Sequence, residues 1–215
     1  MIPNDRVASE KAILVGLNAD CFKPEETATE ASLDELEALL ETAGGLCEAK
    51  VLQNRHTPDP HCFIGEGKAE EVRQLVENTG ATLVVFDNDL SPAQIRSLEE
   101  LTQATVLDRS ALILDIFAQR AKTKEGRLQV ELAQYQYLLP RLIGMWTHLE
   151  RQAGTSGKGP IGSKGPGETQ LETDRRHIHR KIDKLKEDLD EVRRVRGTQR
   201  ERRMKNEIPV VAIVG

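Results

Sequence analysis

The sequence predicts an α/β protein, with a small parallel sheet flanked by helices, followed by a long antiparallel two-helix coiled-coil hairpin with a Gly-rich tip. Three observations support this prediction. Short apolar runs rich in branched residues alternate with amphipathic segments in the first half of the chain, which is typical of parallel strands joined by crossover helices. Two later segments repeat apolar residues every three or four positions. Between them lies a run of glycine, proline and lysine that can form neither helix nor ladder strand.

The first half alternates predicted strands and helices. The strands are expected within residues 12–17, 47–53, 81–87 and 104–107. Ser32 and Glu35 read as a capping box for a helix that Gly44 stops, and a second helix is expected over 69–79. Ser91, Pro92 and Gln94 predict the start of a third helix. The order β-α-β-α-β-α-β-α favours right-handed crossovers in a parallel sheet.

The second half predicts the two arms of the hairpin. An apolar stripe from Leu114 to Leu149 indicates one long helix, with a kink just before Pro140. Thr169 and Glu172 read as the capping box of the second arm, whose seam is spaced four-three-four-three. The seam comprises Ile178, Ile182, Leu185, Leu189 and Val192. The alternative is two separate helices packed on a globular core.

Three regions follow from this pattern. Residues 1–109 are the predicted α/β domain, and residues 110–206 are the helical hairpin, with its Gly-rich loop at 154–167. Residues 207–215 read as a buried strand that ends in Gly215, where the glycine-rich turn of a P-loop nucleotide-binding domain begins. The chain stops before a P-loop lysine. We therefore expect this chain to bind its partner without hydrolysing a nucleotide.

Charge divides the chain into an acidic body and a basic arm. Residues 151–206 carry 16 Lys and Arg against 9 Asp and Glu, whereas residues 1–150 carry 14 against 25. This asymmetry indicates that the arm meets a polyanion, although a charge run can also be a solvated face. Aromatic residues make up 3% of the chain, which argues against a base-stacking module. The predicted RNA contacts are Arg151, Lys158, Lys164, Gly165, Gly167, Arg175, Arg176 and Arg180.

Two further sets of residues could bind ligands in the α/β domain. Gly65, Gly67 and Lys68 precede a helix and could approach a phosphate, or form a tight turn with a solvated lysine. Ligands of parallel sheets bind beyond the carboxyl ends of the strands. The polar residues that follow the predicted strands are therefore a second candidate site, on one rim of the sheet. The rim residues are Asn18, Asp87, Asn88 and Asp108, and the alternative is that the two aspartates cap turns.

Metal, disulfide and membrane signals are weak. His56, His61 and Cys62 lack a fourth ligand and a regular spacing, so no metal is predicted. The 3 cysteines are odd in number, which indicates reduced thiols in a cytoplasmic protein. No apolar run approaches the roughly 20 residues of a membrane span. Integral membrane insertion is therefore not expected.

Several stretches closely resemble the HflX family of ribosome-associated GTPases. The most specific are Gly165–Arg176, with the pattern GPGE-x-x-LE-x-DRR, and Val85–Gln94. The resemblance implies an N-terminal α/β domain, a hairpin and a Ras-like GTPase domain, of which residues 207–215 would be the truncated start. It also implies GTP and Mg²⁺ binding through that domain.

The same resemblance implies a partner and a role. Family members bind the large (50S) ribosomal subunit and its rRNA, with the hairpin loop directed toward the peptidyl-transferase region, and split stalled ribosomes under stress. Some members are credited with ATP binding or RNA unwinding by the N-terminal part, for which Gly65, Gly67 and Lys68 are the matching feature here. The alternatives are therefore an ATP-dependent RNA remodeller and a protein-protein coiled-coil module.

Overall fold

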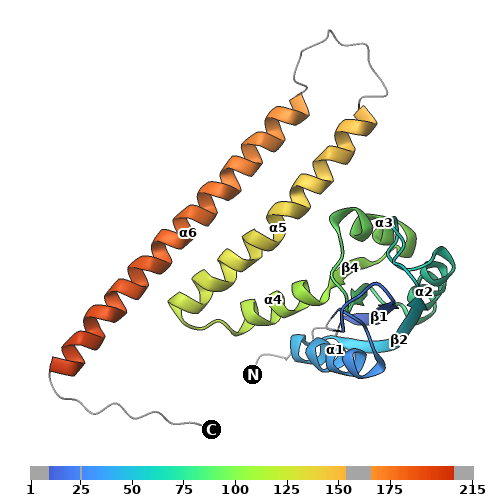
Figure 1. The fold of residues 1–215 in the computed structure, drawn as a ribbon, viewed down its shortest axis with the longest axis horizontal. Helices are drawn as coiled ribbons and strands as arrows, with labels where there is room; N and C mark the ends of the chain where they lie inside the picture. The colour runs from blue at the N-terminus through green and yellow to red at the C-terminus, as the bar shows by residue number, and fades with distance from the viewer. Residues whose placement is uncertain (1–9, 25, 154–165, 206–215) are drawn as a thin grey trace, which may run out of the picture.

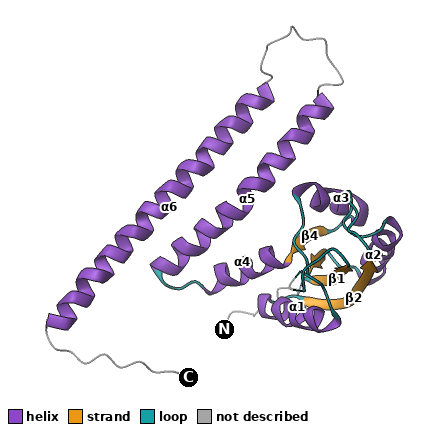
Figure 2. Ribbon diagram, viewed as in Figure 1, coloured by secondary structure: helices purple, strands orange, loops and turns teal. Residues whose placement is uncertain are grey.

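The computed structural model describes residues 10–24, 26–153 and 166–205, which form four strands and six helices (Figures 1 and 2). They alternate in the predicted order through the first half of the chain. The elements are β1 (Lys11–Ala19), α1 (Glu30–Ala43), β2 (Leu46–Arg55), α2 (Glu66–Thr79), β3 (Leu83–Phe86), α3 (Pro92–Thr102), β4 (Thr105–Asp108), α4 (Arg109–Arg120), α5 (Lys124–Ala153) and α6 (Pro166–Lys205).

The strands form one parallel sheet, as predicted, and their order in the sheet is β2-β1-β3-β4. Leu14 of the central strand β1 lies opposite Lys50 of β2 and Val85 of β3. Side chains alternate between the two faces of a strand, so a strand covered on both sides must be apolar throughout. This explains why the run that begins at Ala12 is apolar without interruption and why its side chains are buried.

Each face of the sheet has its own hydrophobic core. Ile13 and Val15 pack with Val72 of α2 and Leu98 of α3 in one cluster. The other cluster joins the opposite face of β1 to α1 and α4, and its members include Ala12, Leu14, Leu36, Leu40, Leu112 and Ile116. Helix α4 therefore belongs to the layered α/β body.

Two helix starts differ from the sequence prediction. Helix α1 begins at Glu30, because Thr29 Oγ1 accepts a hydrogen bond from Ser32 N at 3.1 Å and Ser32 Oγ accepts one from Thr29 N at 2.8 Å. The predicted box of Ser32 and Glu35 is therefore wrong by one turn. Helix α2 begins at Glu66, ahead of the expected residue 69.

Other caps agree with the prediction. Gly44 ends α1 at a φ of 95°, a left-handed conformation that glycine adopts without steric cost. Ser91 and Gln94 form the reciprocal capping box of α3, with Pro92 in the first turn. Both helix ends were readable from sequence because the capping residue and its partner lie within four positions of each other.

Helices α5 and α6 lie side by side and run antiparallel, forming the arm seen in Figure 1. Their ion pairs fix the direction, because Lys181 lies 3.7 Å from Glu131 whereas Arg196, further along α6, pairs with the earlier Glu125. The seam residues Ile182, Leu185 and Leu189 are buried, as predicted. Residues 154–165 of the predicted Gly-rich loop 154–167 lie outside the described residues, as do residues 206–215, whereas residues 166 and 167 form the start of α6. Helix α6 begins at Pro166, ahead of the predicted capping box of Thr169 and Glu172, whose side chains are likewise not described.

The first arm is not the single helix that the apolar stripe predicts. Helix α4 ends at Arg120, Ala121 is extended, and α5 begins at Lys124. Thr123 Oγ1 accepts a hydrogen bond from Gly126 N at 3.0 Å, so it caps the new helix. The chain can change direction here, which lets α4 pack against α1 while α5 pairs with α6. Pro140 lies within α5.

Candidate functional site

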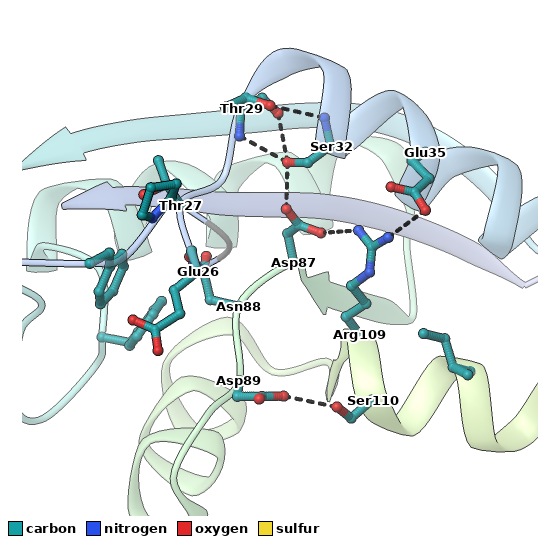
Figure 3. A pocket seen from close by; sticks show the side chains of 14 residues that line it. Glu26, Thr27, Thr29, Ser32, Glu35, Asp87, Asn88, Asp89, Arg109 and Ser110 are labelled. Carbon is teal, nitrogen blue, oxygen red and sulfur yellow. Dashed lines mark hydrogen bonds and ion pairs between the residues drawn. The ribbon is translucent and has the colours of Figure 1, made fainter.

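A cavity of about 770 Å³ lies at the carboxyl end of the sheet, between the first turns of α1 and α4 (Figure 3). The sheet order places the chain's change of direction between β1 and β3, which is where ligands of open parallel sheets bind. One part of the wall is apolar, with the Phe22 and Phe63 rings stacked at 6.2 Å. Phe63 has a φ of 65°, an uncommon conformation for a residue with a side chain.

Asp87 and Arg109 organise the polar wall (Figure 3). Arg109 donates to Asp87 Oδ1 at 2.8 Å and pairs with Glu35 at 2.7 Å, while Ser32 Oγ donates to Asp87 Oδ2 at 2.5 Å. Burial lowers the pKa of Arg109, but its hydrogen bonds to Glu35 and Asp87 outweigh burial and raise it overall. The network ties the starts of α1 and α4 to the end of β3.

Asn88 closes the inner side of the cavity. Its Oδ1 accepts from Leu17 N at 2.8 Å, and its Nδ2 donates to the carbonyl oxygens of Leu17 and Glu26. The cavity wall carries the carboxylates Glu26, Glu35, Asp87 and Asp89 against the single guanidinium of Arg109. A phosphate would meet net negative charge here, and the Ser32 hydroxyl in the first turn of α1 already donates to Asp87.

The predicted rim is therefore right in part. Asp87 and Asn88 line the cavity together. Asn18 does not, because β1 continues to Ala19 and holds Asn18 opposite Asn54 within the sheet. Asp108 is also separate, since it is fully buried and its carboxylate faces α5.

Asp108 is the centre of a second polar cluster that sequence reasoning missed. Its Oδ1 caps α4 by accepting from Ala111 N at 2.9 Å, which agrees with the capping alternative. The same Oδ1 accepts a hydrogen bond from Tyr137 Oη at 2.7 Å, and Oδ2 accepts one from Arg141 Nη2 at 2.5 Å. Burial, followed by the hydrogen bond to Asp108, raises the pKa of Tyr137, so its hydroxyl remains a donor at neutral pH.

At the start of α2, Gly65 and Lys68 already make contacts with other residues of the chain. Gly65 N donates to Gln53 Oε1 at 2.9 Å, and Gly67 lies inside the first turn of the helix. Lys68 Nζ pairs with Glu71 at 2.6 Å. A phosphate at this position would compete with both contacts, so the predicted phosphate role of these residues stays a prediction.

His56 and His61 each contact a polar side chain that is distant in the sequence. His56 Nδ1 lies 2.6 Å from Asp20 Oδ2, and His61 Nε2 lies 3.3 Å from Ser97 Oγ. Within the described part of the chain, no group of three or more His, Cys, Asp or Glu could hold a metal. Over the same residues, no helix has the length and apolar character needed to cross a bilayer.

The predicted RNA contacts fall on and beside the arm. Arg175, Arg176 and Arg180 are exposed on the first part of α6, near the end of the arm that faces away from the α4–α5 turn. Arg151 and Gly167 belong to α5 and α6, although the Arg151 side chain is not among the described ones. Lys158, Lys164, Gly165 and Gly215 lie outside the described residues.

The fold is shared with solved structures of GTP-binding proteins. The chain superposes on a structure described as SsGBP in complex with GDP, with a TM-score of 0.61 and 19% identity, over 88% of this chain and 46% of that one. A GTP-binding protein from the archaeon Sulfolobus solfataricus, also with GDP, gives a TM-score of 0.52 and 21% identity, over 86% and 46% of the two chains. At these identities the likeness establishes the fold.

Sequence comparisons identify the family. Residues 30–118 match the family described as GTP-binding GTPase N-terminal, and residues 120–203 match the GTP-binding GTPase middle region. The chain is 48% identical to GTPase HflX of Escherichia coli K12, over 97% of this chain and 46% of that protein. It is 45% identical to GTPase HflX of Flavobacterium psychrophilum, over 100% and 50%. The chain spans about half the length of these relatives, and it belongs to the HflX family of GTPases, as the N-terminal and middle region.

Proposed function

We propose that this chain is the ribosome-binding portion of an HflX-type GTPase, which binds the large (50S) ribosomal subunit and takes part in splitting stalled ribosomes using GTP. The single observation that carries the proposal is the exposed cationic group of Arg175, Arg176 and Arg180 on the two-helix arm. Guanidinium groups fork onto phosphate oxygens, and such contacts position a protein on RNA.

The distribution of charge supports the arm as the contact. The acidic α/β domain would be repelled by an RNA surface, whereas the basic arm would be attracted to it. Two packed helices project a small cross-section, which suits entry into a confined RNA-lined space such as the peptidyl-transferase region. The α/β domain would then remain outside and hold the arm in place.

GTP and Mg²⁺ are proposed to bind in the half of the relatives that this chain does not match. Within the described residues no metal-binding group is present, and the cavity at the strand ends is negatively charged. GTP binding would favour the ribosome-bound state, and hydrolysis would favour release. We expect the protein to act in the cytoplasm, where ribosomes are found.

Salt dependence of binding tests the proposal. Binding of the chain to purified large subunits is measured by co-sedimentation across a series of salt concentrations. Phosphate contacts predict a steep linear fall of log affinity with log salt concentration. The variant Arg175→Gln/Arg180→Gln should bind more weakly at low salt, and its slope should be shallower by about one per lost contact.

A matched variant on the same helix supplies the control. Arg194→Gln/Arg200→Gln removes the same charge from exposed positions near the other end of α6. If binding reflects general attraction to a basic protein, both variants will weaken it equally. If the contact is made by the first part of α6, the affinity of the control variant will stay close to that of the parent chain. A salt-independent affinity would contradict RNA contact and favour a protein-protein role for the arm.

ATP-dependent RNA remodelling by the α/β domain is the second candidate. Its site would be Gly65, Gly67 and Lys68 at the start of α2. The contacts of Gly65 with Gln53 and of Lys68 with Glu71 would have to be exchanged for phosphate contacts. An ATP titration of this chain, with Lys68→Ala as the control, decides the matter, because only saturable binding that the variant loses would support this candidate.

A further inference from the structure

The cluster around Asp108 joins the α/β domain to the arm. Asp108 is the last residue of β4 and is fully buried. It is bound by donors from two different helices, namely the backbone N of Ala111 in α4 and the side chains of Tyr137 and Arg141 in α5. One carboxylate therefore contacts the sheet, the helix that ends the α/β body and the helix that begins the arm.

The two partners on α5 act as a unit. Tyr137 and Arg141 are four positions apart, so they lie on the same face of the helix. The Arg141 guanidinium stacks over the Tyr137 ring at 3.2 Å from its centroid, and Nη1 donates to the Tyr137 carbonyl at 3.0 Å. The buried Nε of Arg141 has no hydrogen-bond partner among the described residues. The guanidinium is thus held by Asp108, by the Tyr137 carbonyl and by the Tyr137 ring.

Apart from a hydrogen bond from Arg127 Nε to the Ala121 carbonyl at the α4–α5 turn, the described surroundings of α5 next to the body are largely apolar. Helix α5 also packs against α3 and α4, and beside Tyr137 lies an apolar groove of about 570 Å³ lined by residues such as Leu107, Leu114 and Leu138. Apolar packing is non-directional and allows one surface to slide or tilt over another. Hydrogen bonds to a buried carboxylate require defined distances and angles. The carboxylate cluster is therefore what specifies one direction for α5.

We propose that Asp108 is a positioning residue, which fixes the direction in which the α5–α6 arm leaves the α/β domain by holding Tyr137 and Arg141. The domain and the arm then move as one body. Without the carboxylate, apolar contacts keep the arm attached, but its angle to the domain varies.

Distance measurement between two spin labels tests this inference in the 215-residue chain. The first label is placed on exposed Cys21 of the α/β domain, and the second on Lys184→Cys, an exposed position of α6. We expect slower labelling of the other thiols at neutral pH, because Cys62 is buried, and because burial and the charge of Glu37 raise the pKa of Cys47 to about 11. The parent chain should give one narrow distance peak.

Three variants remove the contacts in steps. Asp108→Asn keeps an oxygen that can cap α4 and loses the charge that holds Arg141, so we expect the narrow peak to be lost. Tyr137→Phe removes one hydroxyl and should broaden the peak less. Arg141→Met should behave like Asp108→Asn, and Arg141→Lys should restore part of the narrow peak because it returns a positive charge to Asp108.

A stability control separates positioning from a general structural role. Val72→Ala leaves a cavity between α2 and the sheet of the α/β domain, and α2 has no contact with α5 among the described residues. It should lower the urea midpoint and leave the distance peak unchanged. Variants of Asp108 and Arg141 that lower the midpoint yet keep the narrow peak would overturn the inference. If Asp108→Asn does not fold, Tyr137→Phe and the Arg141 pair decide the outcome by the same readout.

The consequence for ribosome binding rests on the proposed function. If the arm must enter RNA at a set angle, Asp108→Asn should weaken large-subunit binding while leaving the salt slope unchanged, because no phosphate contact is lost. The experiments distinguish failure of the proposed function from failure of the positioning role of Asp108. A parent chain that does not bind large subunits contradicts the proposed function, whereas an unchanged distance peak in Asp108→Asn contradicts the positioning role whatever the ribosome does.

Discussion

The α/β domain and the arm are stabilised in different ways. The central strands β1 and β3 are covered on both faces, and side chains such as Ile13, Leu14 and Leu36 have no exposed surface. The described part of α6 buries one narrow seam, whose members Ile182, Leu185 and Leu189 are each 5% exposed. Most of the other described side chains of α6 are charged and exposed to solvent. The stability of the domain therefore depends on the two hydrophobic clusters that cover the sheet, while the stability of the arm depends on a single seam of buried side chains.

This difference matches the division of charge. In the proposed function the α/β domain holds the arm in place, which requires a large hydrophobic core and is compatible with an acidic surface. Under the proposed function, an arm that reaches a polyanion needs long, exposed, basic helices and has few residues available for burial. We expect the two regions to respond differently to mutation, and the following variants test that expectation.

The largest effect is expected in the core of the α/β domain. Leu36→Ala should lower the free energy of unfolding by about 4 kcal/mol, because a fully buried leucine leaves a cavity between α1 and the sheet. Urea denaturation followed by circular dichroism measures this loss. Leu36→Met, which conserves volume, should cost less than about 1.5 kcal/mol. An equal loss in the two variants would indicate that packing at this position does not control stability.

A smaller effect is expected in the arm. Leu185→Ala should cost about 2 kcal/mol, at the low end for a buried leucine, because one neighbouring helix covers it. Hydrogen exchange should show faster exchange in α5 and α6 and unchanged protection in β1 and β3. The control is Val195→Ala at a position of the same helix that is 47% exposed, and it should change little. Loss of protection throughout the sheet would show that the two regions unfold together.

The smallest effect concerns pH and is confined to the α/β domain. Backbone hydrogen bonds from Cys62 and His61 lower the pKa of Asp59 below its ordinary value of 3.8. The folded state therefore favours the ionised carboxylate, so its stabilising effect is present at neutral pH and is lost as the pH falls through the lowered value. Asp59→Asn should lower the unfolding midpoint slightly at pH 7 and match the parent chain at strongly acidic pH. A difference between the two that persists at strongly acidic pH would contradict this account.

Much of the fold could be predicted because its signals are local. The central strands β1 and β3 were found within a few residues, since a strand covered on both faces needs an uninterrupted apolar run. The break between α4 and α5 was missed because the apolar stripe continues in phase across it. Thr123 supplied the only local signal, a hydroxyl three residues before the amide of Gly126. Periodicity describes which face is apolar, and a cap decides where the helix starts.

The clusters around Asp87 and Asp108 could not be predicted from sequence in the same way. Arg109 reaches Asp87 across 22 positions, and Arg141 reaches Asp108 across 33. Sequence reasoning placed both aspartates on one rim because both follow strands. The structure separates them because Asp87 turns toward α1, whereas Asp108 turns toward α5. Which neighbour a carboxylate meets depends on the path of helices far along the chain.

Directed hydroxyl-radical probing of large-subunit RNA tests the central claim most directly. Iron chelates are attached, in a Cys21→Ser background that removes the exposed native thiol, at His177→Cys near the start of α6 or at Arg200→Cys near its end, and both positions are exposed on α6. The account predicts strong, localised rRNA cleavage from position 177, and weaker cleavage from position 200. Cleavage from neither position, or from position 200 alone, would contradict the arm as the RNA-binding element.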